Sequence, residues 1–249
     1  MELVELEKKQ YEGFVKDNKY KSHFLQSYAW GELCKEKRGL TPYYLGLMDK
    51  KKIVAATLLL QKKLPLGLCY LYAPRGYVLD FNDFKILDKF TEEIVKFAKK
   101  KKAIYVKIDP DIIWKKESYD GSVTLMEAKD KKIFNELKRL NYKHLGFTKN
   151  FETMQPRYTF RIDLTQPLEE IEDHFSKTTK QRIAKSLKLE TEVTIGTKND
   201  IKEFYHLMTL TENRKDFISY NEDYYETLYE IFNGTPNSKA TLFLGKVHL

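Results

Sequence analysis

A proline followed two residues later by a glycine ends an apolar run near residue 70, and this pair limits what the surrounding chain can form. The segment reads Tyr72-Ala73-Pro74-Arg75-Gly76-Tyr77-Val78. Pro74 fixes its own φ angle and has no N–H to donate, so we expect a strand to stop there. Gly76 relieves the steric limits on the turn that follows. The segment therefore predicts a strand that ends in a stiff turn before a helix.

The arginine within this turn has two interpretations. Arg75 could bind an anion with both arms of its guanidinium group, because the turn would hold it in place. It could also be a solvated side chain on an ordinary strand-to-helix turn, which is the commoner case. Only its companions elsewhere in the chain give weight to the first interpretation.

The first half of the chain alternates between helical and strand-like patterns. Ser27 and Gly39 suit the two ends of one helix, and Asn82 or Asp83 can cap another. Two apolar runs flank residues 49–52, which is a hairpin signal. We expect helices over residues 2–19, 26–38, 82–102 and onward from a cap at Asp130, and strands over residues 43–48, 53–60, 68–72 and 103–108. Such a mixture predicts an α/β or α+β layer structure with mixed sheets.

Residues 148–157 hold polar residues and a proline, and they predict a boundary between two domains, 1–150 and 151–249. The second half continues with alternating helical and strand-like patterns. We expect a strand over residues 158–164, an acidic helix start over 168–175 continuing as a basic helix over 176–188, a short strand over 193–195, helices over 200–213 and 222–232, and a last strand over 241–247. In the helix over 200–213, the side chains expected to point inward are Ile201, Phe204, Leu207 and Met208.

One sequence pattern occurs twice. Tyr44-Leu45-Gly46-Leu47 follows two helical segments early in the chain, and the similar run 242–247 follows two helical segments late. The repeated pattern predicts two copies of one α/β unit. The first copy continues into a hairpin partner over residues 53–60, whereas the second ends at Leu249, where that partner should begin. A central strand without its neighbour exposes unpaired backbone groups, so we expect either a fragment or a last strand paired by another segment or chain.

The composition favours a soluble protein with an anionic partner. Lys and Arg total 44 against 36 Asp and Glu, a formal charge of +8, which favours polyanions or anionic surfaces. The four lysines at 99–102 close a predicted helix, where cations complement the helix dipole, and we prefer this structural role.

Cys34 and Cys69 are isolated and the five histidines lack ligand spacing, so we expect no metal and no disulfide. No signal peptide and no apolar run approaching roughly 20 residues is present, which predicts a cytoplasmic location.

Five short motifs together resemble one family. They are Gln26-Ser27-Tyr28-Ala29-Trp30-Gly31, Tyr72-Ala73-Pro74-Arg75-Gly76, Lys107-Ile108-Asp109-Pro110, Gln155-Pro156-Arg157-Tyr158 and Thr211-Glu212-Asn213-Arg214-Lys215-Asp216-Phe217. In this order they resemble the FemABX family of nonribosomal peptidyltransferases. The resemblance implies two acetyltransferase-like (GNAT) units, of which the second is incomplete here because members usually extend well beyond Leu249. It also implies transfer of an amino acid from aminoacyl-tRNA to the side-chain amine of a peptidoglycan-precursor peptide, either UDP-linked or lipid-linked, with possible contact to the membrane surface.

The resemblance also assigns residues. Positions at or near Lys35, Tyr105, Asp109 and Arg214 would contact the precursor, with Lys37 competing for the role of Lys35. Asp109 could bind or deprotonate the attacking ammonium, or it could simply end a strand in an Asp-Pro turn. Tyr105 and Lys107 share one face of their strand and could line a groove, or Lys107 could simply be exposed. Arg214 suits phosphate or carboxylate recognition, and its alternative is a cation at a helix C-terminus.

A basic helix face is the candidate for tRNA binding. Lys177, Arg182, Lys185 and Lys188 fall within about 140° of one another on a helix and could follow the backbone phosphates of tRNA. The alternative is an ordinary solvated face.

Two other functions stay open. One is an acyl-CoA N-acyltransferase, although the sequence lacks the glycine-spaced loop that would bind pyrophosphate. The other is a non-catalytic RNA- or precursor-binding module. No cofactor is expected.

Overall fold

The computed structural model describes residues 1–17, 23–113, 116–117, 122–125, 128–146, 155 and 162–247. The chain divides into two compact units, the first formed by Met1–Gly146 with Ile231–Lys239 and the second by Phe147–Glu230 with Ala240–Leu249. The expected assignment of residues 1–150 and 151–249 to two acetyltransferase-like domains stays a prediction.

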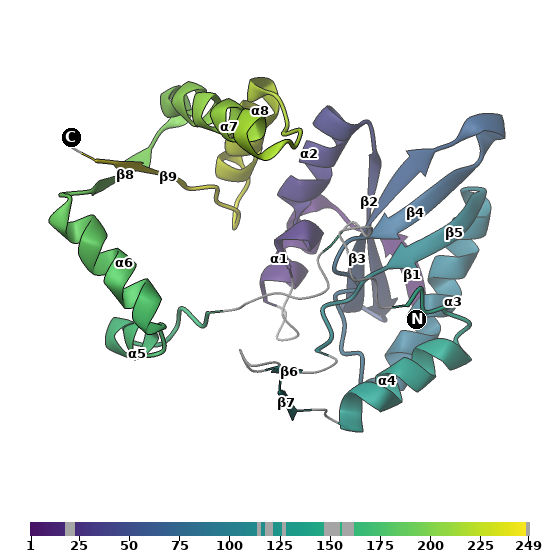
Figure 1. Cartoon of the computed structure of the whole chain (residues 1–249). Helices are drawn as coiled ribbons and strands as arrows, with labels where there is room; N and C mark the ends of the chain where they lie inside the picture. Colours follow the sequence, from purple (N-terminus) through teal and green to yellow (C-terminus); the bar gives the residue numbers. More distant parts are fainter. Residues whose placement is uncertain are drawn as a thin grey trace. The chain divides into compact units, whose positions relative to one another are not determined.

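The first unit is built on a five-stranded mixed sheet (Figure 1). Its strands are β1 (Glu2–Glu5), β2 (Thr41–Asp49), β3 (Lys52–Lys63), β4 (Cys69–Ala73) and β5 (Ala103–Ile108), which lie in the order β1-β2-β3-β4-β5. Neighbouring strands are antiparallel except β4 and β5, which are parallel. Helix α3 (Phe84–Lys100) connects this parallel pair, because parallel neighbours need a crossover. The expected α/β fold with a mixed sheet is confirmed.

Helices cover both faces of this sheet. Helix α3 packs on one face, where Leu47, Leu59, Leu71 and Phe90 belong to the larger core. Helices α1 (Lys8–Lys16) and α2 (Tyr28–Arg38) lie on the other side of the sheet (Figure 1). A second core on that face includes Tyr11, Cys34, Tyr44, Leu58 and Leu60. Both cores are drawn from the same strands, since successive residues of a strand point to opposite faces.

Shorter elements complete the first unit. They are the 3₁₀ turns η1 (Phe24–Gln26) and η2 (Pro65–Gly67), the strands β6 (Lys116–Glu117) and β7 (Val123–Leu125), and helix α4 (Ala128–Arg139). The Arg139 guanidinium of α4 lies 3.2 Å from the carboxylate of Asp88 on α3. The hydroxyls of Tyr142 and Tyr77 are 2.9 Å apart, which ties the chain after α4 to the turn after β4.

Local signals placed several element ends correctly. Ser27 caps α2 through a hydrogen bond from the Trp30 N–H, and Gly39 ends that helix in the left-handed region at φ 59°. Asp83 caps α3 by accepting from the Ile86 N–H at 3.1 Å. The predicted helix over residues 2–19 is wrong at its start, because residues 2–5 form β1 and pair with β2. The predicted start at Asp130 is also wrong, since α4 begins at Ala128.

The turn after β4 folds back onto the sheet. Strand β4 ends at Ala73, directly before Pro74, as expected. Four residues later Val78 and Ala56 exchange two backbone hydrogen bonds of 2.9 and 3.1 Å, so the chain rejoins β3. The segment from Gly76 to Leu79 is buried. The stiff turn is therefore packed against the central strand of the sheet and is not a surface loop.

A buried glutamine holds this turn. The Gln26 side chain is fully buried, and its amide donates to the Pro74 carbonyl at 2.7 Å. Its amide oxygen accepts from the Leu58 N–H at 2.9 Å and from the Thr57 hydroxyl at 3.2 Å. A Cβ atom at Gly76 would lie 2.8 Å from the Gln26 amide nitrogen, so only glycine fits beside it. One side chain thus joins η1, β3 and the turn after β4.

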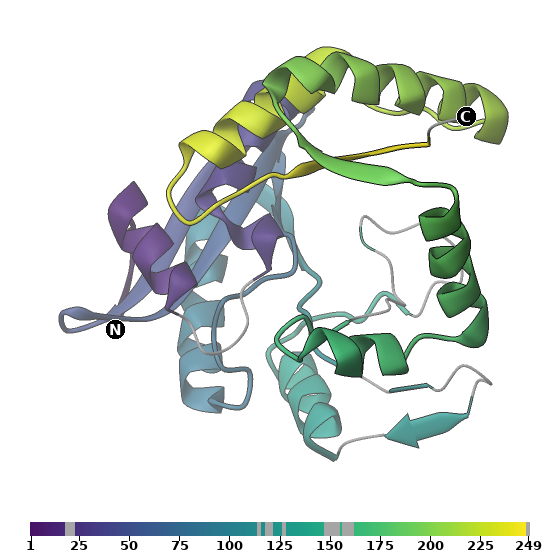
Figure 2. The same ribbon diagram turned by 90° about the vertical axis from the view of Figure 1, so that its left-hand side faces the viewer.

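The second unit contains a two-stranded antiparallel sheet and four helices in the residues described. The elements are α5 (Leu168–Asp173), α6 (Lys177–Lys188), β8 (Glu192–Gly196), the 3₁₀ turn η3 (Lys198–Asp200), α7 (Ile201–Lys215), α8 (Glu222–Gly234) and β9 (Leu242–Lys246). The last residues of α8, from Ile231 on, belong to the first unit. Strands β8 and β9 run side by side in Figure 2 and pair from Glu192–Lys246 to Gly196–Leu242. The order strand, two helices, strand repeats that of β1, α1, α2 and β2, and both strand pairs are antiparallel.

Several predictions for the second half need correction. The acidic and basic helices are separate, because Ser176 caps α6 by accepting from the Thr179 N–H. Leu207 does not point inward, since 48% of its surface is exposed, whereas Ile201 is buried. The strand expected over residues 158–164 falls mostly outside the described residues, and Ile162 and Asp163 are not in a strand. Within the described part of the chain, β9 pairs on one side only, with β8.

We predict that Gln26→Ala lowers the free energy of unfolding by about 3 kcal/mol, because it leaves the Leu58 N–H and the Pro74 carbonyl buried without their partner. Urea unfolding followed by circular dichroism measures the change. The control is Gln10→Ala, which removes an exposed side chain at the start of α1 and should cost less than about 1 kcal/mol. Equal losses for the two variants would contradict the role assigned to Gln26.

Candidate functional site

Asp109 lies where the parallel strands β4 and β5 end. It follows β5 directly and precedes Pro110. One oxygen of its carboxylate accepts from the Arg75 backbone N–H at 2.7 Å, and the other accepts from the Tyr72 hydroxyl at 2.8 Å. Both donors come from the end of β4 and the turn after it. The carboxylate is therefore held by two hydrogen bonds across the sheet and is not merely the start of an Asp-Pro turn.

Burial raises the pKa of Asp109 above its ordinary value. Hydrogen bonds from the Arg75 N–H and the Tyr72 hydroxyl, and then the positive charges of Arg75 and Lys107, act in the opposite direction without cancelling the effect of burial. A raised pKa means a carboxylate that holds a proton more tightly than a solvated aspartate. Such a group is suited to accepting a proton from an ammonium ion.

Tyrosines and a lysine line the face of β4 and β5 that leads to Asp109. Tyr70 and Tyr105 stack with ring centroids 5.2 Å apart and planes at 10°. The Lys107 ammonium lies 5.6 Å from the ring centroid of Tyr72. Leu71, Val106 and Ile108 belong to the core beneath α3, so these polar residues occupy the opposite face. We call Tyr70, Tyr72, Tyr105 and Lys107 the tyrosine–lysine face.

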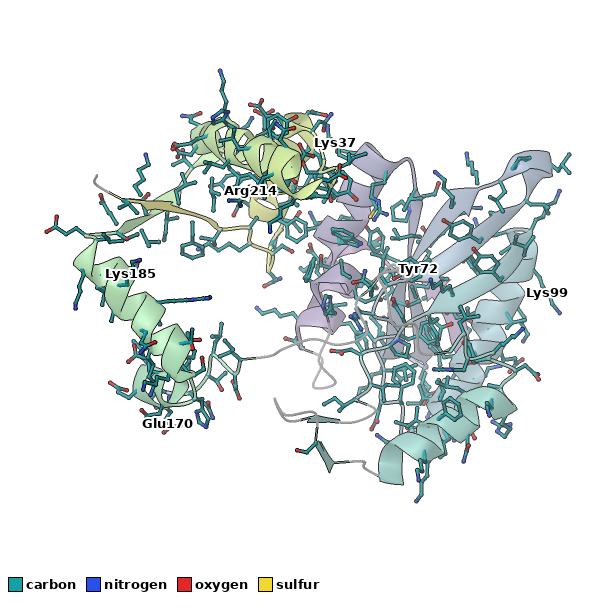
Figure 3. The ribbon with its side chains drawn as sticks, viewed as in Figure 1. Lys37, Tyr72, Lys99, Glu170, Lys185 and Arg214 are labelled. Atoms are coloured by element: carbon teal, nitrogen blue, oxygen red, sulfur yellow. The ribbon has the colours of Figure 1, made fainter. Side chains whose placement is uncertain are left out.

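The exposure of these side chains differs along the face. Tyr105 is 49% exposed, whereas Tyr72 is 3% exposed and lies within the sheet, where Figure 3 labels it. The pKa of Tyr105 is raised by burial and by the neighbouring Tyr70. Arg75 adopts a left-handed backbone conformation with φ 52°. An open ring on the strand that leads to a fixed carboxylate forms a surface on which a sugar or peptide can lie.

Of the residues predicted from the sequence, the structure brings together Asp109, Arg75 and Lys107 at the ends of β4 and β5. Tyr105 lies on the same face of β5, four residues before Asp109, where it stacks on Tyr70. Lys35 lies on α2, which covers the face of the sheet opposite α3, and its ammonium is 3.7 Å from the Glu32 carboxylate of the same helix. Lys37 follows it on the same helix (Figure 3). The role of Lys35 stays a prediction.

The other predicted residues belong to the second unit. Arg214 lies in the last turn of α7 and is exposed (Figure 3). The four basic residues of α6, which are Lys177, Arg182, Lys185 and Lys188, are all exposed. The opposite side of α6 is open too, since Ile183 is 43% and Leu187 71% exposed. The binding roles of Arg214 and of α6 stay predictions.

Sequence reasoning missed Tyr70 and Tyr72 as parts of the site. The available signal was alternation, since both residues occupy the same face of a short strand that ends before Pro74.

Among the residues that the structure describes, no group of three His, Cys, Asp or Glu side chains is placed to hold a metal ion. None of the described helices combines the length and apolar character needed to cross a bilayer.

Comparison with known proteins gives consistent results. Aminoacyltransferase FemB of Staphylococcus epidermidis is 28% identical to this chain, over 92% of the chain and 55% of that protein. Lipid II:glycine glycyltransferase of Staphylococcus haemolyticus is 29% identical, over 99% of the chain and 56% of that protein. The crystal structure of FemX superposes with a TM-score of 0.83 at 26% identity and covers 99% of the chain and 58% of FemX.

The chain therefore spans a little over half the length of these relatives. Its order of strands and helices, its motifs and its similarity to FemX all agree with one assignment. The model of the FemAB family matches residues 6–249, which is nearly the whole chain. This chain belongs to the FemAB family.

Proposed function

We propose that this chain is part of a cytoplasmic aminoacyltransferase that moves an amino acid from aminoacyl-tRNA to the side-chain amine of a peptidoglycan-precursor peptide. The observation that carries the proposal is the partly buried carboxylate of Asp109, held by Tyr72 and Arg75 at the end of an open tyrosine–lysine face. The names of the relatives support aminoacyl or glycyl transfer, and one of them names lipid II. Because the chain spans only part of those proteins, the activity is proposed for the protein to which it belongs.

The reaction needs little covalent help from the protein. The amine nitrogen attacks the ester carbonyl of the aminoacyl-tRNA, an amide bond forms, and the ester C–O bond breaks. The precursor amine is an ammonium ion at neutral pH and must first lose a proton. A second proton leaves the nitrogen as the amide forms, and the ribose oxygen of the tRNA takes up a proton as it departs. The protein therefore has to orient the amine, accept a proton and stabilise the oxyanion.

Asp109 is the group we assign to the amine. A negative carboxylate attracts the ammonium, and a raised pKa brings its proton affinity closer to that of the amine. Tyr72 and the Arg75 N–H fix both oxygens, so the carboxylate has one orientation when the substrate arrives. This is the geometry expected of a catalytic base that must not rotate away from its substrate.

The remaining residues are assigned to binding. Tyr105 offers an exposed ring, supported from behind by Tyr70, against which the precursor can pack. Lys107 and Arg75 carry positive charge next to Asp109 and suit the anionic groups of a peptidoglycan precursor. Lys35 and Arg214 are assigned to the same ligand, and the basic side of α6, with Lys177, Arg182, Lys185 and Lys188, to the phosphates of tRNA.

The function is tested directly by incubating the protein with tRNA that carries a labelled amino acid and with either a UDP-linked or a lipid-linked precursor. We expect label to appear in the precursor, in an amide bond that survives mild base. Deacylation of the tRNA without labelled precursor would reject the proposal. Acetyl-CoA should leave the melting temperature unchanged, whereas a concentration-dependent rise would favour acyl-CoA transfer instead.

We predict that Asp109→Asn lowers the transfer rate by about 10²- to 10⁴-fold, because the general base is lost.

The same change should not lower the melting temperature near neutral pH. The pKa of Asp109 is raised in the folded chain, so wild-type stability falls as the pH rises from the ordinary aspartate pKa through the raised one. Asparagine has no such ionisation, and thermal melts across this pH range should show the difference. A less stable variant at neutral pH would contradict this reasoning.

We predict that Tyr72→Phe moves the acidic limb of the pH–rate profile to higher pH. The lost hydroxyl stabilised the ionised carboxylate of Asp109, so its removal raises the pKa further. The control is Tyr70→Phe, which keeps the ring stacked on Tyr105 and removes a hydroxyl from the same face of β4. The assignment of Asp109 as the base fails if the two variants have the same profile.

We predict that Arg214→Ala weakens binding of a UDP-linked muropeptide about tenfold, as measured by calorimetry, because a bidentate contact to an anionic group is lost. Lys215→Ala is the matched control, since it removes the neighbouring cation from the same last turn of α7. Equal effects of the two variants, with the fold intact, would show that Arg214 only complements the helix dipole.

A further inference from the structure

An exposed leucine marks the turn between β3 and β4. Leu66 in η2 is 94% exposed and adopts a left-handed conformation with φ 60°. The turn is closed by a hydrogen bond of 2.9 Å from the Leu64 N–H to the Leu68 carbonyl, and Leu68 is itself 38% exposed. A fixed turn that presents a leucine to solvent gains nothing for the fold from that side chain. The packing of the described chain therefore gives no reason for a leucine at this position.

Lysines surround this turn. Lys62 and Lys63 precede it at the end of β3 and are exposed. Lys101 and Lys102 lie beside the residue that follows the turn, because the Cys69 N–H donates to the Lys102 carbonyl at 3.2 Å and the Cys69 thiol to the Lys101 carbonyl at 3.1 Å. Lys99 and Lys100 directly precede them in the last turn of α3. Figure 3 labels Lys99 at the end of α3. We call this surface the lysine–leucine end; its members are Lys62, Lys63, Leu66, Leu68, Lys99, Lys100 and Lys102.

The segments that build this end contain no acidic residue. The sequence has neither Asp nor Glu between Asp49 and Asp80, nor between Glu93 and Asp109. Complementing the helix dipole accounts for cations in the last turn of α3, but it does not account for Lys62, Lys63 or Leu66, which belong to other elements. What remains to be explained is a group of exposed lysines near an exposed leucine.

We propose that the lysine–leucine end docks the protein on a bilayer surface that carries anionic lipids. Lysines near such a surface are attracted to the headgroups, and an apolar side chain at the centre enters the boundary with the acyl chains. Nucleic acid would use the same lysines but offers nothing to a leucine that is almost fully exposed. The proposal rests on this surface alone and does not require the transfer reaction to be correct.

The test is co-sedimentation of the 249-residue chain with vesicles of phosphatidylcholine alone or mixed with phosphatidylglycerol. We expect binding to the mixed vesicles only. The triple variant Lys62→Gln, Lys63→Gln, Lys102→Asn should bind them about 100-fold more weakly. Leu66→Asn should bind about tenfold more weakly, and asparagine tolerates the left-handed backbone at this position.

The matched control removes the same number of charges from the other end of β3. Lys50→Asn, Lys51→Gln, Lys52→Gln changes the β2–β3 turn, where Lys50 has φ 56°, close to the 57° of Lys102. We expect this variant to bind vesicles like the wild type. Equal losses in the two triple variants would overturn the proposal, because net charge alone would explain binding.

Two further results would also overturn it. The first is equal binding to neutral and anionic vesicles. The second is a pair of observations: Leu66→Asn binds vesicles fully, and the triple variant at Lys62, Lys63 and Lys102 loses binding to tRNA, measured by filter retention. The surface would then be an RNA site. Thermal melts of each variant, measured by circular dichroism, establish that loss of binding does not come from unfolding.

Discussion

The hydrogen bonds of one buried amide decide where the proposed catalytic carboxylate lies. Gln26 accepts from β3 at Leu58 and donates to the Pro74 carbonyl in the turn after β4. The next residue of that turn, Arg75, offers its backbone N–H to Asp109. A buried amide is costly to leave without partners, so the turn is fixed relative to β3. The position of Asp109 thus depends on a residue that lies on the opposite face of the sheet from α3.

The parallel pairing of β4 and β5 supplies the other half of this arrangement. In a parallel pair both strands end at the same edge, so Tyr72 and Asp109 meet although they are 37 residues apart. The crossover helix α3 occupies one face, which leaves Tyr70, Tyr105 and Lys107 on the face that α3 does not cover. Aromatic rings and a cation then lie along one face of the strands that ends at a partly buried carboxylate, without any insertion or special loop. The fold itself creates the surface to which we assign the precursor.

The sequence predicted the features that depend on neighbours along the chain. Ser27 and Asp83 cap the starts of their helices and Gly39 caps the end of one, as expected, and the hairpin over residues 49–52 forms. These features depend on neighbouring residues, because caps and tight turns are local. Strand β1 was missed because its stability comes from pairing with β2 some 40 residues later: Leu3 packs into one core and Val4 into the other. Asp109 was found from its motif, but its partners Tyr72 and the Arg75 N–H were not, since nothing local specifies a contact across two strands.

The two ends of β4 and β5 have different chemistry, and this difference has a geometric consequence. Asp109 and Arg75 lie at the carboxyl ends, whereas the lysine–leucine end lies at the amino ends, next to Cys69 and Ala103. A strand of this length separates them by about 20 Å. If the two proposals are both correct, the length of these strands sets the height of Asp109 above the bilayer surface.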